Sequence, residues 1–218
     1  MDNMSRIINE IMIPALGQTM YMVVFATIYA SIIGIFLATI LVVTAEDGLR
    51  PNRYIYKSLD VVTNILRSFP FVILAIAILP FTRAVVGTTI GMQAAILPLV
   101  MVESPFVARV IEVDLRKVNR GMIEAAKSFG ASDMQIIFKV IFKEAIPSIC
   151  LSITLVTVSI VGSSAMAGAL GAGGLGSVAI IYGYQSFNDF VMYGTVFILV
   201  IMVQGIQSIG SVIYKRLK

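Results

Sequence analysis

The chain has 218 residues, of which 58% are hydrophobic and only 13% are charged, with a formal net charge of +4. The charged fraction is about half that of an average soluble domain, which argues against a soluble enzyme of this size. The absence of histidine removes the commonest metal ligand and the near-neutral general base. The single cysteine, Cys150, excludes an intrachain disulfide and a cysteine-based zinc site.

The few charges are distributed so that five long stretches carry none. These stretches are Ile11–Ala45, Ser68–Thr82, Ala84–Val102, Ala145–Asn188 and Phe190–Tyr214. A membrane-spanning helix needs about 20 predominantly apolar residues, whereas a surface helix of a soluble protein must present a polar face to water. The sequence therefore predicts an all-α polytopic membrane protein that forms a single domain over residues 1–218.

The first three predicted spans differ in how clearly they are bounded. The apolar part of the first, Tyr21–Val43, is far longer than the 7–15 apolar residues of a typical signal peptide, so we interpret it as a transmembrane helix. Ser68–Thr82 is short for a span, and Pro70 and Pro80 fit its boundaries better than its centre. Ala84–Val102 is long enough to cross the membrane.

The 44-residue stretch Ala145–Asn188 is ambiguous, because it could hold two helices or one helix followed by a long apolar connection. Five glycines lie near its middle, and such a run tends to break a helix. They are Gly168, Gly171, Gly173, Gly174 and Gly176. Phe190–Tyr214 follows as a span of sufficient length.

The distribution of basic residues distinguishes between five and six spans, because cytoplasmic segments carry an excess of lysine and arginine. With five spans, Glu46–Arg67, Glu103–Glu144 and the tail after Tyr214 share one side and hold 14 of the 16 basic residues. Only Arg6 and Arg83 then lie outside, whereas a sixth span would move the basic tail outside. The sequence thus predicts five transmembrane helices with the N-terminus outside and the C-terminus in the cytoplasm. The juxtamembrane positive charge suits anionic lipid headgroups, so no nucleic-acid partner is expected.

The longest polar segment, Glu103–Glu144, is the predicted cytoplasmic docking loop for any soluble partner. It is expected to form two short helices around a turn. Asn119 is a plausible N-cap of the first helix and Gly130 a left-handed residue after its end. Ser132 and Gln135 match a capping box at the start of the second helix. An amphipathic helix resting on the membrane surface is the alternative interpretation of the same pattern.

Within this loop, Glu124, Ala125 and Ala126, followed by Gly130, resemble the EAA loop of ABC-importer permease subunits (E-A-A-x3-G-x9-I-x-L-P). The resemblance implies a coupling helix that sits in a cleft of an ATP-hydrolysing subunit and transmits its motion. Small alanines permit close packing in such a cleft, and the glycine permits a sharp turn. The end of the motif departs from the family. Isoleucine, leucine and proline are replaced by Val140, Phe142 and Lys143, and a proline comes only at Pro147.

Further segments are similar to the methionine-import permeases of this family. They are 64–71, 80–83, 87–91, 93–96, 104–109, 162–166 and 171–176. The resemblance implies a homodimeric permease of the bacterial inner membrane that works by alternating access with two ATP-binding subunits and an extracytoplasmic methionine-binding protein. ATP and Mg²⁺ would be held by the partner ATPase, and this chain would need no cofactor or metal of its own. A permease for another amino acid or small nutrient, and an ATP-independent secondary carrier, remain as alternatives.

The sequence does not support several other activities. Gly171, Gly173 and Gly176 satisfy G-x-G-x-x-G but follow an apolar span rather than a strand, so a dinucleotide site is not expected. No G-x-x-x-x-G-K-[ST] motif occurs, so ATP hydrolysis requires a separate subunit. The sequence also lacks a nucleophile with a histidine partner, and we therefore expect the chain not to be an enzyme.

The candidate substrate path lies on the fourth predicted span. Ser163 and Ser164 are candidate polar contacts, although most such hydroxyls simply bond to backbone. The resemblance places Met166 near the narrowest point of the path, where a flexible thioether suits an adaptable apolar gate. No ionisable residue lies in the middle of a predicted span, which argues against a proton- or ion-coupled secondary carrier.

Overall fold

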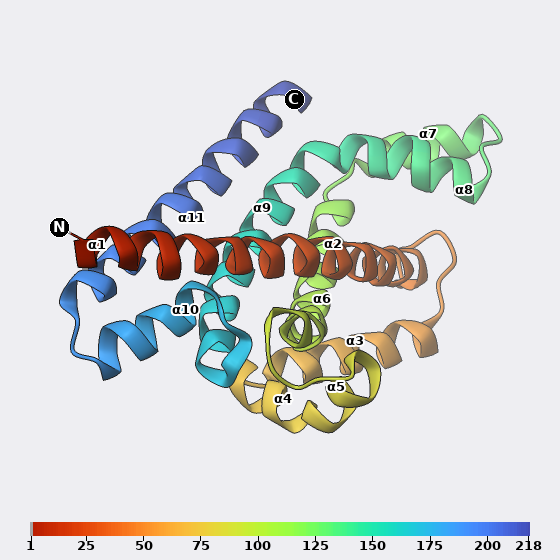
Figure 1. Cartoon of the computed structure of the whole chain (residues 1–218). Helices are drawn as coiled ribbons and strands as arrows, with labels where there is room; N and C mark the ends of the chain where they lie inside the picture. The colour runs from red at the N-terminus through yellow and green to blue at the C-terminus, as the bar shows by residue number, and fades with distance from the viewer. Residues whose placement is uncertain (1) are drawn as a thin grey trace.

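The computed structural model describes residues 2–218, with side chains from Ser5 onward, and every regular element within that range is helical (Figure 1). In chain order, the elements are α1 (Asp2–Ile7), π-helical η1 (Ile8–Met12), α2 (Ile13–Thr44), α3 (Arg53–Ser68), α4 (Phe71–Ala77), α5 (Leu79–Val86), α6 (Met92–Arg116), α7 (Arg120–Ser128), α8 (Asp133–Gln135), η2 (Ile136–Ile141), α9 (Phe142–Ala167), η3 (Gly168–Ala172), α10 (Gly174–Val178), η4 (Ala179–Gln185) and α11 (Asp189–Leu217).

Four helical stretches of the described chain are long and apolar enough to cross a membrane. They are Ser5–Thr44, Met92–Arg116, Asp133–Ala172 and Asp189–Leu217. A fifth crossing is available if α3 and α4, which meet at an angle of 102°, form one broken span. The predicted all-α polytopic class is therefore confirmed, with four continuous spans and one bent pair in place of five simple helices.

The second and third predicted spans have different bounds in the structure. The chain turns at Pro70, whose ψ of 132° is extended, so Ser68–Thr82 is not one helix and the second crossing instead begins at Arg53. The third span begins at Met92 rather than Ala84, because Gly87 and Gly91 adopt positive φ values of 85° and 93°. It then continues to Arg116, well past the predicted end at Val102.

Helix α3 directs some of its polar side chains toward the protein and exposes several of its apolar side chains. Tyr56 and Asp60 hydrogen-bond to α6, while Val61, Val62 and Ile65 are each more than half exposed. This is the reverse of a water-soluble amphipathic helix. Hydrocarbon can solvate such an apolar face, whereas polar groups within a membrane must be satisfied by the protein. The pattern supports assigning α3 to the membrane-embedded part of the chain.

The glycine run breaks the fourth span as predicted. Gly171, Gly173 and Gly174 have φ values of 88°, 80° and 76°, a region that favours glycine. The chain then returns through α10 and η4, which are too short to span a bilayer. The long uncharged stretch is thus one transmembrane helix followed by a short helical return segment, which settles the ambiguity left by the sequence.

Helix α2 holds this return segment in place. The Gln18 side chain accepts a hydrogen bond from the Gly174 backbone N–H at 2.7 Å, and the Thr19 hydroxyl accepts one from Leu175 at 2.8 Å. These bonds satisfy N–H groups that have no partner within α10, since the first N–H groups of any helix lack one. The N-terminal part of the chain therefore fixes the glycine-rich corner, as its position beside α10 in Figure 1 also shows.

Replacing Gly176 with alanine is expected to destabilise the fold through this corner. An added Cβ would clash with the backbone of Ala165 in α9, which cannot move as a flexible side chain can. Overpacking of this kind costs about 2 kcal/mol. Thermal unfolding in detergent should detect the loss. Gly205→Ala in α11 is the matched control, because an added Cβ there meets nothing within 4 Å; equal stability of the two variants would contradict the assigned packing.

Candidate coupling loop and translocation face

A network of charges at the end of α6 defines one end of the molecule. Glu112 is only 2% exposed and pairs with Arg109 at 2.7 Å and with Arg116 at 3.0 Å. Arg109 also bonds Asp60 of α3 at 2.6 Å, and Tyr56 reaches Glu112 at 3.3 Å. A carboxylate this deeply buried requires compensating partners. The network therefore ties α3 and α6 together at their shared end.

Two further ion pairs connect the α7–α8 loop to the α2–α3 connection. Arg120, the first residue of α7, pairs with Asp47, and Arg50 pairs with Asp133 of α8 at 2.5 Å. These contacts join positions that are 73 and 83 residues apart in sequence. The pairs are largely exposed, so each adds little to stability on its own. Together they restrict the orientation of α7 and α8, which project at one corner of the molecule away from α4 and α5 (Figure 1).

The predicted helix signals in this loop are confirmed. The Asn119 side chain caps α7 by accepting from the Gly121 N–H at 2.8 Å, and Ser132 and Gln135 form the predicted capping box. Gly130 has a φ of 78° and its N–H bonds the Lys127 carbonyl. That is the left-handed termination expected of a glycine directly after a helix.

The residues of the EAA-like motif lie on the outer side of α7. Glu124 and Ala125 are exposed and Ala126 is half-buried. Ile123 and Ala126 pack against the hydrophobic core, whereas Phe129 is 91% exposed. The apolar side chains of this part of the loop are therefore divided between the core and the outside. Phe129 and the exposed residues of the motif are therefore accessible on the outside of the loop.

The departure from the family pattern after Gly130 has a structural counterpart. The second loop helix does not end near Phe142 or Lys143, where the family has its leucine and proline. It instead continues through η2 into α9 as one helical stretch, Asp133–Ala172, and Pro147 lies inside α9. The second loop helix and the fourth transmembrane helix are consequently one continuous helical stretch.

The predicted path residues lie on α9, but they face in different directions. Met166 is 53% exposed and Ser163 is half-buried, whereas Ser164 is 1% exposed and donates to the Val161 carbonyl. Ser159, which is not among the predicted path residues, is exposed and shares the face of Ser163 and Met166 through spacings of four and three residues. Ser159, Ser163 and Met166 are hereafter called the α9 face.

A charged residue behind this face was missed. Glu103 is the twelfth of 25 residues in α6, is 2% exposed, and accepts hydrogen bonds from Ser163 at 2.9 Å and Ser159 at 3.2 Å. The expectation that no ionisable residue lies in the middle of a span is therefore wrong. The charge-free stretch ends at Val102, so Glu103 is expected to begin the polar loop, whereas α6 continues for 13 residues beyond Glu103. Glu103 lies in the middle of a helix only because α6 continues to Arg116.

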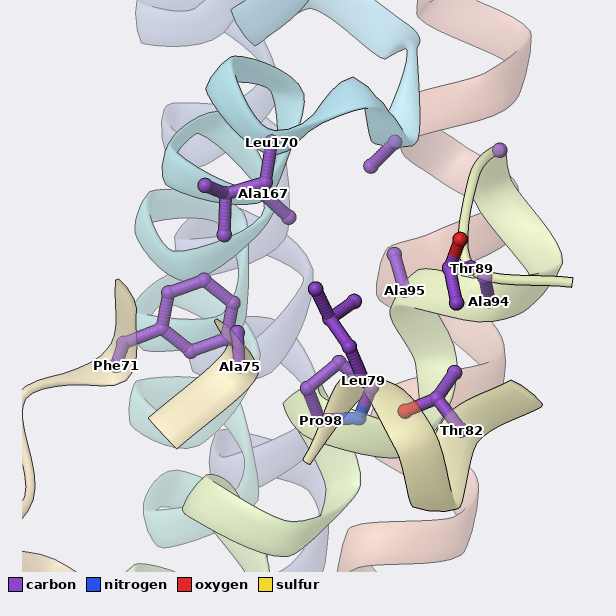
Figure 2. A pocket seen from close by; sticks show the side chains of 12 residues that line it. Phe71, Ala75, Leu79, Thr82, Thr89, Ala94, Ala95, Pro98, Ala167 and Leu170 are labelled. Carbon is purple, nitrogen blue, oxygen red and sulfur yellow. The ribbon is translucent and has the colours of Figure 1, made fainter. Parts of the chain in front are cut away.

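A small cavity lies at the opposite end of the molecule from the loop, between α4, α5, α6 and η3 (Figure 2). Its volume is about 30 Å³, and its lining is mostly apolar, including Phe71, Leu79 and Leu170. The Thr82 hydroxyl is buried there without a hydrogen-bond partner in the described part of the chain. This space can hold a water molecule but not an amino acid, so we do not assign it as a substrate site.

The helical architecture, with four or five candidate membrane spans in the described part of the chain and an exposed loop at one end, defines a polytopic membrane protein. Residues 30–218 match the family model described as binding-protein-dependent transport system inner membrane component. The chain belongs to this family.

Among its relatives, the chain is similar to permeases of methionine transport systems. The chain is 46% identical over 208 residues to the probable D-methionine transport system permease protein MetI of Vibrio cholerae, covering 95% of this chain and 92% of that protein. It is 46% identical over 175 residues to the methionine import system permease protein MetP of Bacillus subtilis, covering 80% and 78%. It also superposes on a chain of the inward-facing MetNI methionine ABC transporter with a TM-score of 0.94 and 38% identity, covering 95% of this chain and 96% of that one.

Proposed function

We propose that this chain is the permease subunit of an ATP-driven importer that moves methionine across the bacterial inner membrane. Two copies would assemble with two ATP-binding subunits and receive substrate from an extracytoplasmic methionine-binding protein. The membership in the transport family and the names of the similar permeases support this assignment. ATP and Mg²⁺ would be bound by the partner, while this chain contributes the path and the lever.

The continuous helical stretch Asp133–Ala172 carries the mechanistic part of the proposal. In this mechanism, the ATP-binding subunit holds the exposed surface around Glu124, Ala125, Ala126 and Phe129. Because α7 packs against η2 and the second loop helix continues through η2 into α9, displacement of the docked loop would move the α9 face. Closure of the ATPases would then open the path outward, and hydrolysis would return it inward.

The proposed topology places the N-terminus outside and the C-terminus in the cytoplasm. Ion pairs support this topology, because they join the α2–α3 connection to the end of α6 and to the α7–α8 loop. These three segments therefore lie together at one end of the molecule. Those segments are rich in basic residues, as cytoplasmic segments are; they hold Arg50, Arg109, Arg116, Lys117, Arg120 and Lys127. The glycine-rich corner held by Gln18 and Thr19 would then face outward, toward the binding protein.

Within the path, we assign Met166 and Ser163 as residues adjacent to the passing substrate and Ser164 as a packing residue behind them. Met166 is half exposed on the α9 face. Because its thioether side chain is flexible, it can adapt its conformation to close an apolar constriction. Ser164 bonds its own helix backbone and is buried, which leaves its hydroxyl engaged away from the path.

Uptake of labelled methionine into proteoliposomes tests the function. With the complete complex, accumulation is expected only when ATP and the loaded binding protein are both present. Accumulation without ATP would instead indicate a secondary carrier. ATPase stimulation by a binding protein for a different small nutrient, but not by the methionine-binding protein, would support a permease of other specificity.

A further inference from the structure

Glu103 is a buried carboxylate in the middle of a membrane-spanning helix. It is 2% exposed, and among the residues whose side chains the structure describes no lysine or arginine forms an ion pair with it. Ionisable groups at this depth are costly, and they typically face a path or a polar partner. Glu103 differs in this respect from Glu112, which lies nine residues later in α6 and is paired with two arginines.

The hydrogen bonds of Glu103 lead toward the α9 face. Ser159 and Ser163 both donate to the same carboxylate oxygen, Oε1. In the described part of the chain no donor bonds Oε2, although a carboxylate can accept about four hydrogen bonds. Ser159 is exposed and Ser163 half-buried, so the two hydroxyls stand between the carboxylate and the surface that also carries Met166.

We propose that Glu103, with the hydroxyl groups of Ser159 and Ser163 in front of it, forms a subsite that binds cations. This subsite would stabilise the positive charge of the α-ammonium group of the amino acid that passes along the α9 face. The inference rests on the proposed function, since it assigns the substrate's positive charge to a site within the path. An ammonium group that leaves water for an apolar constriction loses hydration. A preorganised carboxylate with hydroxyl groups in front of it offsets that loss.

Thiol chemistry tests the subsite without any transport. In a Cys150→Ser background, Ser159→Cys provides a single reactive thiol on the α9 face. The assembled complex is reacted with cationic 2-aminoethyl methanethiosulfonate or anionic 2-sulfonatoethyl methanethiosulfonate, and each rate is normalised to that of a free thiol. A fixed negative charge raises local cation concentration and rate by about tenfold or more. We therefore expect the cation-to-anion ratio to be high with Glu103 and to collapse in Glu103→Gln.

The exposed Glu46→Gln is the matched control and should leave the ratio unchanged, because Glu46 lies in the α2–α3 connection rather than in a span. A ratio that does not respond to Glu103→Gln would overturn the proposal, since the carboxyl would then be neutral and serve only to join α6 to α9. Absence of reaction with either reagent would overturn it as well, because the face would be closed to a ligand.

Import measurements connect the subsite to transport. Glu103→Gln is expected to lower methionine accumulated per ATP hydrolysed by about tenfold, whereas Glu103→Asp, which keeps the charge, should retain most of it. A purely structural carboxyl would give the reverse order, because glutamine preserves size and can still accept from both serines. If the wild-type complex imports no methionine, the proposed function fails, but the thiol ratio still decides whether the cation subsite exists.

Discussion

A Gly130→Val substitution is expected to abolish stimulation of the partner ATPase by loaded binding protein while leaving membrane insertion intact. Gly130 ends α7 at a φ of 78°. A β-branched residue is strained in this region, at a cost of about 1–2 kcal/mol. Because Phe129, 91% exposed, directly precedes it, relief of the strain would displace the proposed docking surface. Phosphate release by the purified complex measures the effect, which we expect to be a fall of about tenfold or more.

Gly130→Asn is the matched variant, because asparagine tolerates the left-handed region better than most residues. It should preserve most of the stimulated ATPase activity. An added Cβ at this position meets nothing within 4 Å, so side-chain clashes cannot account for a difference between the two variants. If Gly130→Val kept full substrate-stimulated turnover, the assignment of this loop as the lever would be wrong.

Replacement of Glu112 with glutamine is expected to cause the largest loss of stability. The substitution conserves size but removes the negative charge that Arg109 and Arg116 share. Breaking a buried ion pair from one side costs about 3–5 kcal/mol. The lower end, about 3 kcal/mol, applies here because the two arginine side chains are 30% and 35% exposed and water can partly solvate them. The free energy of unfolding in detergent, followed by denaturant titration, measures the change.

Glu144→Gln serves as the control for this prediction, since Glu144 is exposed and forms no ion pair in the described part of the chain. Its stability should stay within about 0.5 kcal/mol of the parent. A Glu112→Gln variant that lost no more than the control would show that the α3–α6 network contributes little. The α7–α8 loop would then need another source of rigidity.

The local features of the loop could be predicted because they depend on neighbouring residues. Asn119, Ser132 and Gln135 satisfy helix ends only a few positions away. Gly130 adopts its conformation because the chain must leave α7 there, and its lack of a Cβ permits the required φ. The same reasoning explains why the glycine run at the end of α9 was recognised as a break.

Other features could not be predicted because they depend on contacts between distant segments. Phe129 points outward whereas Ile123, in the same loop, packs inward. The neighbours of α7 decide this difference. From the sequence alone, the polar residues of α3 are expected to face water. In the structure, Tyr56 and Asp60 instead hydrogen-bond to side chains of α6. Gln18 and Thr19 carry no signal of their contact with α10, which is 156 residues away.

The sequence by itself determined the membrane class and the glycine break, because charge-free length and backbone freedom are properties of local composition. It also predicted the cytoplasmic loop and its resemblance to a coupling motif. The tertiary structure alone decided that α6 continues past Glu103 and that α9 brings Ser159 and Ser163 to this carboxylate. The physical reason is that the burial of a charge depends on which helices surround it, and sequence spacing does not record those neighbours.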